Sequence, residues 1–287
     1  MFVLRYDGYD IVRCSFCDLV FVNKRFSDDE MKEWYAEGYY TGQWEKVYQD
    51  YLGEAQHRIA YLRTRVRELR QFVQSGRLLE IGCAAGFFLE AAKPYFDVRG
   101  VELSEFSSRY ARDVLGHSVH TGTVASARFD DDTFDVIIMS DVIEHLTDPR
   151  STLAEARRVL KRDGVILIST GNVSSWLARR DLFKWKLMGP PWHLYYYSPQ
   201  SLKRLLAAEG FVVFHLYTNS RYTYSQNRVV NNAALGWITS RFRLGDIMFA
   251  YCQRAASVEL RRLARRRWGE PDLSRGTRDW RGLTTGA

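Results

Sequence analysis

The sequence predicts an α/β fold in which helices cover both faces of a mainly parallel sheet. Short apolar runs alternate with amphipathic segments between about residues 57 and 218, and strands linked by helices of about ten residues imply parallel neighbours. The run 136–139 is apolar at every position, as in strands buried on both faces. Gly82 and Gly86 bracket the turn from the first apolar run into a helix. Ligands of such sheets bind beyond the carboxyl ends of the strands.

The individual elements follow from apolar spacing and from the glycines and prolines that end helices. In the first helix, Ile59, Leu62, Val66, Leu69 and Phe72 share one face. The predicted helices are 57–73, 87–93, 105–115, 149–160 and 199–209. The predicted strands are 77–81, 98–102, 118–121, 134–139, 165–170 and 211–217, with 247–252 as a candidate seventh.

The composition is that of an ordinary globular protein. The 287 residues are 46% hydrophobic and 26% charged, which excludes a fully disordered chain, collagen and a disulfide scaffold. The length suits one large domain or two modest ones. No apolar run approaches the roughly 18 residues of a membrane span, and the first ten residues lack an apolar signal core. We therefore expect a cytoplasmic protein without a membrane span.

The formal charge of +7 is concentrated near the C-terminus, where nine arginines face four acidic residues from Arg254 onward. A basic tail can bind nucleic acid or anionic lipid. The same charges also suit a solvated helix and a frayed end. We favour the second interpretation and do not predict a nucleic-acid partner.

The turn after the first strand combines glycines with two acidic residues. Glycine lets a ligand approach the backbone, and the following helix points its N-terminus at the ligand. Phe87 stands where a dinucleotide fingerprint has its third glycine. Glu80, at the strand end, suits an ammonium group rather than a pyrophosphate. Glu102, twenty residues after Gly82, can accept hydrogen bonds from both hydroxyls of a ribose.

Four segments together resemble the class I S-adenosylmethionine-dependent methyltransferases, over roughly residues 57–254. They are Glu80-Ile-Gly-Cys-Ala-Ala-Gly86, Val101-Glu-Leu-Ser104, Phe134-Asp-Val-Ile-Ile-Met-Ser-Asp-Val-Ile-Glu-His-Leu-Thr-Asp-Pro149 and Leu160-Lys-Arg-Asp-Gly-Val-Ile-Leu-Ile-Ser169. The third carries the E-H-x-x-D-P motif of a branch that includes small-molecule O- and N-methyltransferases. The resemblance implies a Rossmann-like sheet of seven strands with an antiparallel last strand. Ala84 stands where the family usually has glycine, and alanine is tolerated there at negative φ.

The resemblance also implies S-adenosyl-L-methionine as the cofactor and names its contacts. The implied residues are Glu80, Gly82, Cys83 and Gly86 for the methionyl end, Glu102 for the ribose, Leu103, Thr123 and Val124 for the adenine, and Ser140, through its backbone, for the methionine end. We expect Cys83 to be a small packing residue rather than a nucleophile.

Methyl transfer requires alignment of the acceptor and, for a hydroxyl, removal of its proton. Asp141, Glu144 and His145 are spaced i, i+3 and i+4, so a helical turn brings them within reach of one another. His145 is a candidate base, and a role in positioning is the alternative that we favour. In the ubiquinone-pathway branch of the family, the matching residues hold a divalent cation. We name Asp141 and His145 as candidate catalytic residues and assign no metal ligand.

A second catalytic candidate lies in the run Pro-Pro-Trp-His-Leu-Tyr-Tyr-Tyr-Ser-Pro at 190–199. Relatives carry a similar run near the acceptor pocket. His193 is therefore a candidate base or a hydrogen-bond donor to the acceptor. The three tyrosines that follow it also suit plain packing.

Residues 1–56 contain Cys14 and Cys17, which resemble one knuckle of a zinc ribbon. A structural zinc site needs four ligands, and no other Cys or His precedes His57, so we expect no bound zinc. Either the second pair has been lost or it precedes residue 1 of this sequence. The aromatic pairs Trp34-Tyr35 and Tyr39-Tyr40 suit either a lid over the cofactor or core packing.

We therefore divide the chain into an N-terminal segment (1–56), a methyltransferase domain (57–254) and a basic tail (255–287). We predict an S-adenosylmethionine-dependent methyltransferase whose partner is a small-molecule acceptor, with a hydroxyl of a sugar or secondary metabolite as the methylated group. One alternative is an RNA or protein methyltransferase that docks through the tail, although no N-P-P-Y signature follows the strand 134–139. Another alternative is a non-catalytic partner that only binds the cofactor. The sequence leaves the oligomeric state open.

Overall fold

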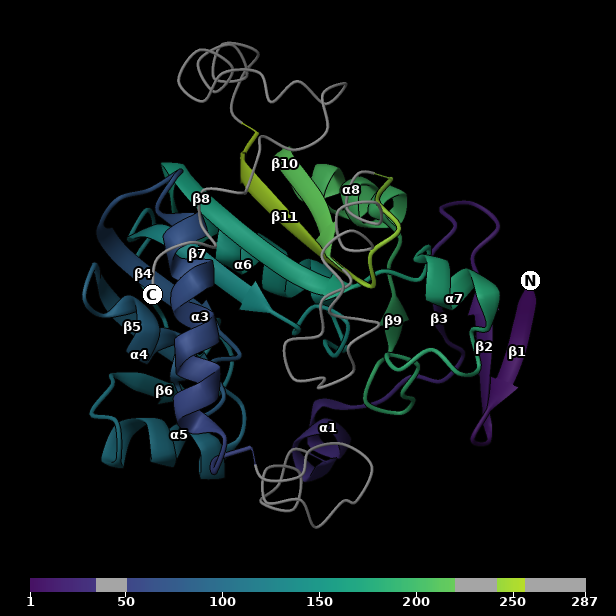
Figure 1. The fold of residues 1–287 in the computed structure, drawn as a ribbon, viewed down its shortest axis with the longest axis horizontal. Helices are drawn as coiled ribbons and strands as arrows, with labels where there is room; N and C mark the ends of the chain where they lie inside the picture. The colour runs from purple at the N-terminus through teal and green to yellow at the C-terminus, as the bar shows by residue number, and fades with distance from the viewer. Residues whose placement is uncertain (35–50, 220–241, 256–287) are drawn as a thin grey trace.

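The computed structural model describes residues 1–34, 51–219 and 242–255, and a seven-stranded sheet lies at its centre (Figure 1). The strand order is β10-β11-β8-β7-β4-β5-β6. The strands are β4 (Gly76–Ile81), β5 (Phe96–Glu102), β6 (Val119–Thr121), β7 (Phe134–Ser140), β8 (Leu160–Gly171), β10 (Phe211–Asn219) and β11 (Ile247–Arg254). The five strands from β4 to β8 pair in parallel, whereas β11 lies antiparallel between β8 and β10. The predicted fold class is confirmed.

Helices cover both faces of this sheet (Figure 1). On one face lie α3 (Ala55–Leu69), α4 (Phe87–Ala92) and α5 (Glu105–Asp113), and on the other lie α6 (Pro149–Val159) and α8 (Pro199–Ala208). Strand β7 shows why both faces are covered. Val136 and Ile138 belong to the core under α3 and α4, while Ile137 and Met139 belong to the core under α6 and α8. Successive side chains of a strand point to opposite faces, so an uninterrupted apolar strand needs cover on both.

Asp148 and Pro149, the last two residues of the E-H-x-x-D-P motif, form the start of helix α6. The Asp148 side chain accepts hydrogen bonds from the backbone N–H groups of Arg150 and Ser151, and Pro149 fills the first helical position. An aspartate cap satisfies amides that have no partner inside the helix, and proline there loses no hydrogen bond. These two residues therefore fix where the loop after β7 ends.

A second sheet joins the N-terminus to a segment far along the chain. Its antiparallel strands, in spatial order, are β1 (Phe2–Tyr6), β2 (Tyr9–Arg13), β3 (Val20–Val22) and β9 (Tyr195–Tyr196). Helices α1 (Asp28–Trp34) and α7 (Trp176–Arg180) also belong to this part of the molecule. A third core holds it together, formed by Ile11, Val20, Val22, Phe26, Met31, Val173, Ala178, Trp185, Met188, Leu194 and Tyr196. The N-terminal segment thus shares its core with residues 173–196.

Two element boundaries differ from the prediction by more than two residues. Helix α3 ends at Leu69 rather than at residue 73, although Phe72 still packs against Tyr251 with ring centroids 4.6 Å apart. Strand β8 begins at Leu160 rather than at residue 165. The lid candidates Tyr35, Tyr39 and Tyr40 and the basic tail from residue 256 lie outside the described residues.

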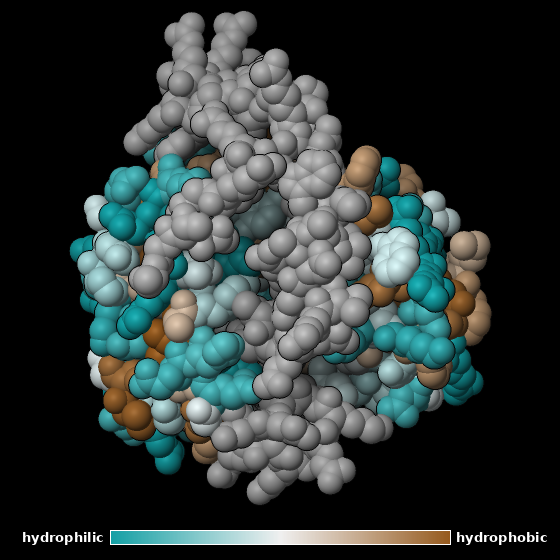
Figure 2. Space-filling view, viewed as in Figure 1, coloured by the Kyte–Doolittle hydropathy of each residue, from teal (hydrophilic) through white to brown (hydrophobic). Residues whose placement is uncertain are grey.

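None of the helices in the described ranges combines the length and the apolar character that crossing a membrane requires. Figure 2 shows mostly hydrophilic residues among the coloured atoms of one face, with hydrophobic residues in small scattered groups.

Candidate active site

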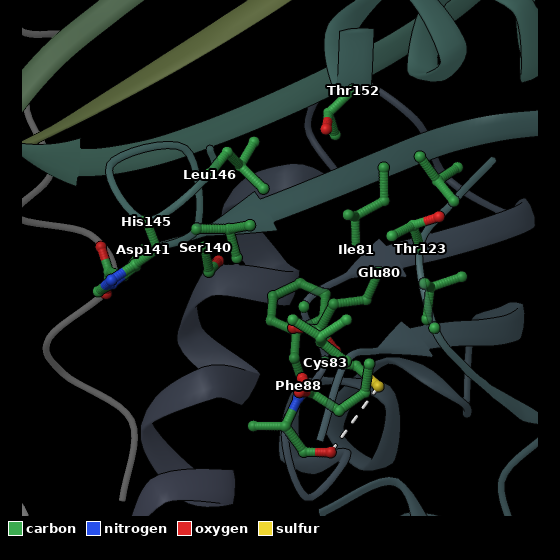
Figure 3. Close-up of a pocket in the computed structure, with 18 of the residues that line it drawn as sticks. Glu80, Ile81, Cys83, Phe88, Thr123, Ser140, Asp141, His145, Leu146 and Thr152 are labelled. Atoms are coloured by element: carbon green, nitrogen blue, oxygen red, sulfur yellow. Dashed lines mark hydrogen bonds between the residues drawn. The ribbon is translucent and has the colours of Figure 1, made fainter. Parts of the chain in front are cut away.

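A pocket of about 450 Å³ lies at the carboxyl ends of the central strands (Figure 3). Its volume is in the range of small-molecule sites. Ten of the twelve site residues predicted from the sequence line it: Glu80, Gly82, Cys83, Glu102, Leu103, Thr123, Val124, Ser140, Asp141 and His145. Gly86 and His193 are not among the lining residues. In Figure 3, Asp141 and His145 lie at one end of the pocket and Cys83 and Phe88 at the other.

The two glycines of the first loop have different tasks. Gly82 has φ +73°, and a Cβ atom on it would lie 2.5 Å from Cγ2 of Val142. A side chain at 82 would therefore push against the pocket wall. Gly86 has φ +80°, and its Cβ would lie 3.0 Å from Cβ of Ala111 in α5. Gly86 thus permits close packing of the loop against α5.

Ala84 corrects one expectation. Its φ is +45°, in the left-handed region that alanine was expected to avoid, which costs an L-residue about 1–2 kcal/mol. The backbone N–H of Ala84 donates a 2.8 Å hydrogen bond to Oε2 of Glu102. This charge-assisted bond offsets part of the strain and ties the loop to the end of β5.

The Glu80 carboxyl group is buried and incompletely paired. It is 5% exposed, and its Oε2 has no hydrogen-bond partner among the described residues. Burial, and then the neighbouring Glu102, raise the pKa of Glu80 well above its usual range. A positively charged ligand would favour the ionised form and supply the missing partner, so the site suits an ammonium group.

Glu102 is held by the backbone through both of its oxygens. Oε2 accepts from Ala84 and Oε1 accepts from the N–H of Ser104, each at 2.8 Å. Burial raises the pKa of Glu102, and these hydrogen bonds oppose the rise. A carboxylate has about four lone-pair positions, so two hydroxyl groups can still bind. The carboxylate is therefore preorganised for a diol such as that of a ribose.

The N-terminal region and α3 also line the pocket, which sequence reasoning missed. Met31, Tyr51 and Arg58 are among the lining residues. Tyr51 stacks on Phe87 with ring centroids 5.2 Å apart, and the Arg58 guanidinium lies 4.4 Å from the centre of the Tyr51 ring. Arg58 also forms a 2.8 Å ion pair with Glu54. A helical arginine usually faces solvent, so apolar periodicity alone did not single it out.

The residues after β7 form a turn rather than a regular helix. Asp141 has φ +53°, and its Oδ1 accepts a 3.2 Å hydrogen bond from the Ser169 hydroxyl. Glu144 is buried, at 4% exposed, and burial and then the charge of Asp141 raise the pKa of Glu144 to about 8. Asp141 thus acts on Glu144 electrostatically, while its own side chain is directed to Ser169.

His145 is paired with His193, which comes from a distant loop. The two imidazole centroids are 4.6 Å apart at an interplanar angle of 65°. His145 Nδ1 lies 2.8 Å from the carbonyl oxygen of Trp192, and His193 Nδ1 lies 2.7 Å from that of Leu187. Burial, and then the neighbouring His193, lower the pKa of His145 to about 3. Burial also lowers the pKa of His193, so both rings are neutral at neutral pH.

Cys14 and Cys17 lie between β2 and β3 as free thiols. Hydrogen bonds from the backbone of Cys17 and Phe16 lower the pKa of Cys14. Within the described residues, neither cysteine belongs to a group of three or more side chains able to bind a metal.

Replacing Cys14 and Cys17 together by serine is expected to leave the zinc content of the purified chain unchanged. The melting temperature is expected to shift by less than about 2 °C, because substitutions at partly exposed positions rarely matter more. Elemental analysis and thermal melting of both forms check this. Loss of a bound zinc from the double variant would show that the knuckle is a working site.

Comparison with known proteins places the chain in a family. The methyltransferase domain family matches residues 51–216, which is more than half of the chain. A ubiquinone biosynthesis O-methyltransferase of Idiomarina loihiensis is 31% identical over 145 residues, covering 46% of this chain and 60% of that protein. An uncharacterized protein of Methanocaldococcus jannaschii is 32% identical over 117 residues, covering 41% and 55%. The matches thus span little more than half of these relatives' length.

Solved structures share the fold. One is an S-adenosylmethionine-dependent methyltransferase of Thermotoga maritima, described as a possible histamine N-methyltransferase, with 23% identity, a TM-score of 0.52 and coverage of 70% of this chain and 92% of that one. Another, from Archaeoglobus fulgidus, has 19% identity, a TM-score of 0.53 and coverage of 71% and 99%. The chain therefore belongs to the methyltransferase domain family, and it shares the fold of S-adenosylmethionine-dependent methyltransferases.

Proposed function

We propose that the chain uses S-adenosyl-L-methionine as its cofactor and methylates a hydroxyl group of a small molecule, such as a sugar or a secondary metabolite. The observation that carries the proposal is the position of His145 and Asp141 in the pocket wall directly after β7. A side chain with a free electron pair at this position can accept a hydrogen bond from the hydroxyl group of the substrate and hold it beside the cofactor. The matched relative from Idiomarina loihiensis is named as an O-methyltransferase, which supports oxygen as the acceptor atom.

For the cofactor, we assign the buried Glu80 carboxyl group to its ammonium and Glu102 to its ribose hydroxyls. Gly82 and Cys83 border the same end of the pocket, and Leu103, Thr123 and Val124 form the wall assigned to the adenine. The Cys83 thiol is 3% exposed, and burial raises its pKa well above the usual range, as suits a packing residue. The bound cofactor supplies an activated methyl group on a sulfonium sulfur.

For the acceptor, we assign His145 to the hydroxyl. A carbonyl oxygen accepts hydrogen bonds only, so the contact with Trp192 places the ring proton on Nδ1 and leaves Nε2 as the basic nitrogen. A pKa of about 3 makes this imidazole a weak base, since general bases work best with a pKa near the operating pH. His145 therefore orients the acceptor by accepting its hydrogen bond, and the hydroxyl proton passes to solvent when the methyl group is transferred. The His193 ring packs against the His145 ring and holds its orientation.

Turnover with a panel of acceptors tests the proposal. The purified chain is incubated with S-adenosylmethionine and, separately, with sugars, phenolic metabolites, small amines, RNA and protein, and formation of S-adenosylhomocysteine is measured. We expect product with small hydroxylated compounds. Product with RNA or protein alone would overturn the proposal and favour docking through the basic tail. Cofactor binding without turnover on any class would favour a non-catalytic role.

A further inference from the structure

We propose that Glu144, His145 and His193 form a binding site for one divalent transition-metal ion at the acceptor end of the pocket. This set differs from the one that the sequence resemblance suggested, in which Asp141 accompanied Glu144 and His145. Asp141 is instead bonded to Ser169, and His193 takes the third position.

The first support is geometric. One ligand atom from each of the three residues lies within 4.8 Å of the other two. In the described ranges, this is the sole cluster of three His, Cys, Asp or Glu side chains that comes so close. Ligands held about 2.1 Å from an ion in a tetrahedral arrangement lie roughly 3.4 Å apart. Side-chain movements of about 1.5 Å or less are therefore enough to close the site.

The second support comes from the groups behind the imidazoles. Each Nδ1 contacts a backbone carbonyl oxygen, at 2.8 Å for His145 and 2.7 Å for His193. Each Nδ1 must therefore carry the ring proton, which makes Nε2 the lone-pair nitrogen in both rings. An N–H donated to a carbonyl is the usual outer partner of a metal-bound histidine, because it fixes both tautomer and ring orientation.

The third support is the Glu144 carboxyl group. Its residue is 4% exposed, and among the described residues its Oε2 has no hydrogen-bond partner. A buried carboxyl oxygen without a partner is costly, and a bound cation would remove that cost. The backbone makes the cluster possible, because the Glu144 carbonyl accepts from the N–H groups of Leu194 and Tyr195 at 2.8 and 3.2 Å. These bonds bring His193 to Glu144 across about fifty residues.

The ligand types indicate the kind of ion. Two imidazoles and one carboxylate suit zinc, iron or cobalt, whereas magnesium and calcium prefer oxygen ligands throughout. Three protein ligands leave a coordination position open, as in catalytic sites. Because His145 also lines the pocket, that position would be available to an acceptor hydroxyl, whose pKa a metal lowers. With the ion bound, Nε2 of His145 would be a metal ligand, so the ion, in place of the imidazole, would hold the acceptor oxygen; this last step rests on the proposed hydroxyl methylation.

Metal titration tests the inference without any methyl transfer. The Cys14→Ser, Cys17→Ser chain is freed of metal and titrated by calorimetry with Zn²⁺ and, by visible absorption, with Co²⁺. We expect one strong site per chain. His193→Ala and Glu144→Gln are each expected to weaken it at least about tenfold, since even the loss of an outer partner costs 10–100-fold. His57→Ala, on the exposed face of α3, serves as the matched control and should bind like the parent.

The same variants are checked for melting temperature and S-adenosylhomocysteine affinity, so that a loss of metal cannot be mistaken for unfolding. Glu144→Gln keeps the volume of the buried side chain and serves if His193→Ala does not fold. Absence of a stoichiometric site, or a site that both variants leave unchanged, would overturn the inference. The proposed methylation would fail separately, by showing no turnover with small hydroxylated acceptors in metal-free or loaded enzyme.

Discussion

Substitution of His145 by alanine is expected to lower turnover about 100-fold or more. The imidazole is the group that we assign to the acceptor hydroxyl, and misplacing a reacting group by about 1 Å costs on the order of 10²-fold. His145 lies away from Cys83 in the pocket (Figure 3), at the end that we assign to the acceptor. The affinity for S-adenosylhomocysteine should therefore change much less. Steady-state kinetics and calorimetry on the same preparation separate the two quantities.

The effect of His193→Ala should be compared with that of His145→Ala. The His193 ring does not line the pocket but contacts the His145 ring edge to face, with centroids 4.6 Å apart. We therefore expect mainly a higher acceptor KM, with turnover reduced less than in His145→Ala. If both variants keep full activity, neither histidine acts on the acceptor, and proton loss is left to solvent.

If an ion is part of catalysis, chelator should abolish the activity of the parent chain and Zn²⁺ should restore it.

Glu102→Ala is expected to weaken S-adenosylhomocysteine binding by about 1.5–3 kcal/mol, or roughly 10–150-fold. That is the scale of lost hydrogen bonds to a charged group. The carboxylate also holds the N–H groups of Ala84 and Ser104, so stability should fall as well. Glu105→Ala removes an exposed acid three residues away and serves as the control. Unchanged affinity in folded Glu102→Ala protein would exclude the ribose assignment.

The central sheet could be predicted because local patterns determine it. The strand β7 is apolar at consecutive positions, and the predicted helix at 199–209 has its serine cap at Ser198, which forms a capping box with Ser201. The acids Glu80 and Glu102 could be placed at one pocket because parallel strands end at the same edge. The strands, the helix cap and the position of the two acids can each be inferred from residues close in sequence and from the parallel pairing of the strands.

The other features depend on contacts between distant segments. The strain of the positive φ at Ala84 is partly offset by the hydrogen bond that its N–H donates to Glu102 of β5, and no local pattern reveals this bond. The pairing of His193 with Glu144 and His145 depends on backbone hydrogen bonds from Leu194 and Tyr195. The i, i+3, i+4 spacing assumed a helical turn, and the chain instead forms an irregular turn there. Long-range hydrogen bonds of this kind leave no periodic trace in the sequence.

The pairing of β3 with β9 joins the N-terminal segment to the segment that carries His193. Val20 and Phe21 pair with Tyr196 and Tyr195, and the Val22 N–H donates to the Leu194 carbonyl at 2.9 Å. The strand that follows His193 is therefore braced by a segment about 170 residues earlier. We therefore expect the N-terminal strands and residues 173–196 to determine acceptor preference together. A chimera should stay active only when both segments are exchanged at the same time.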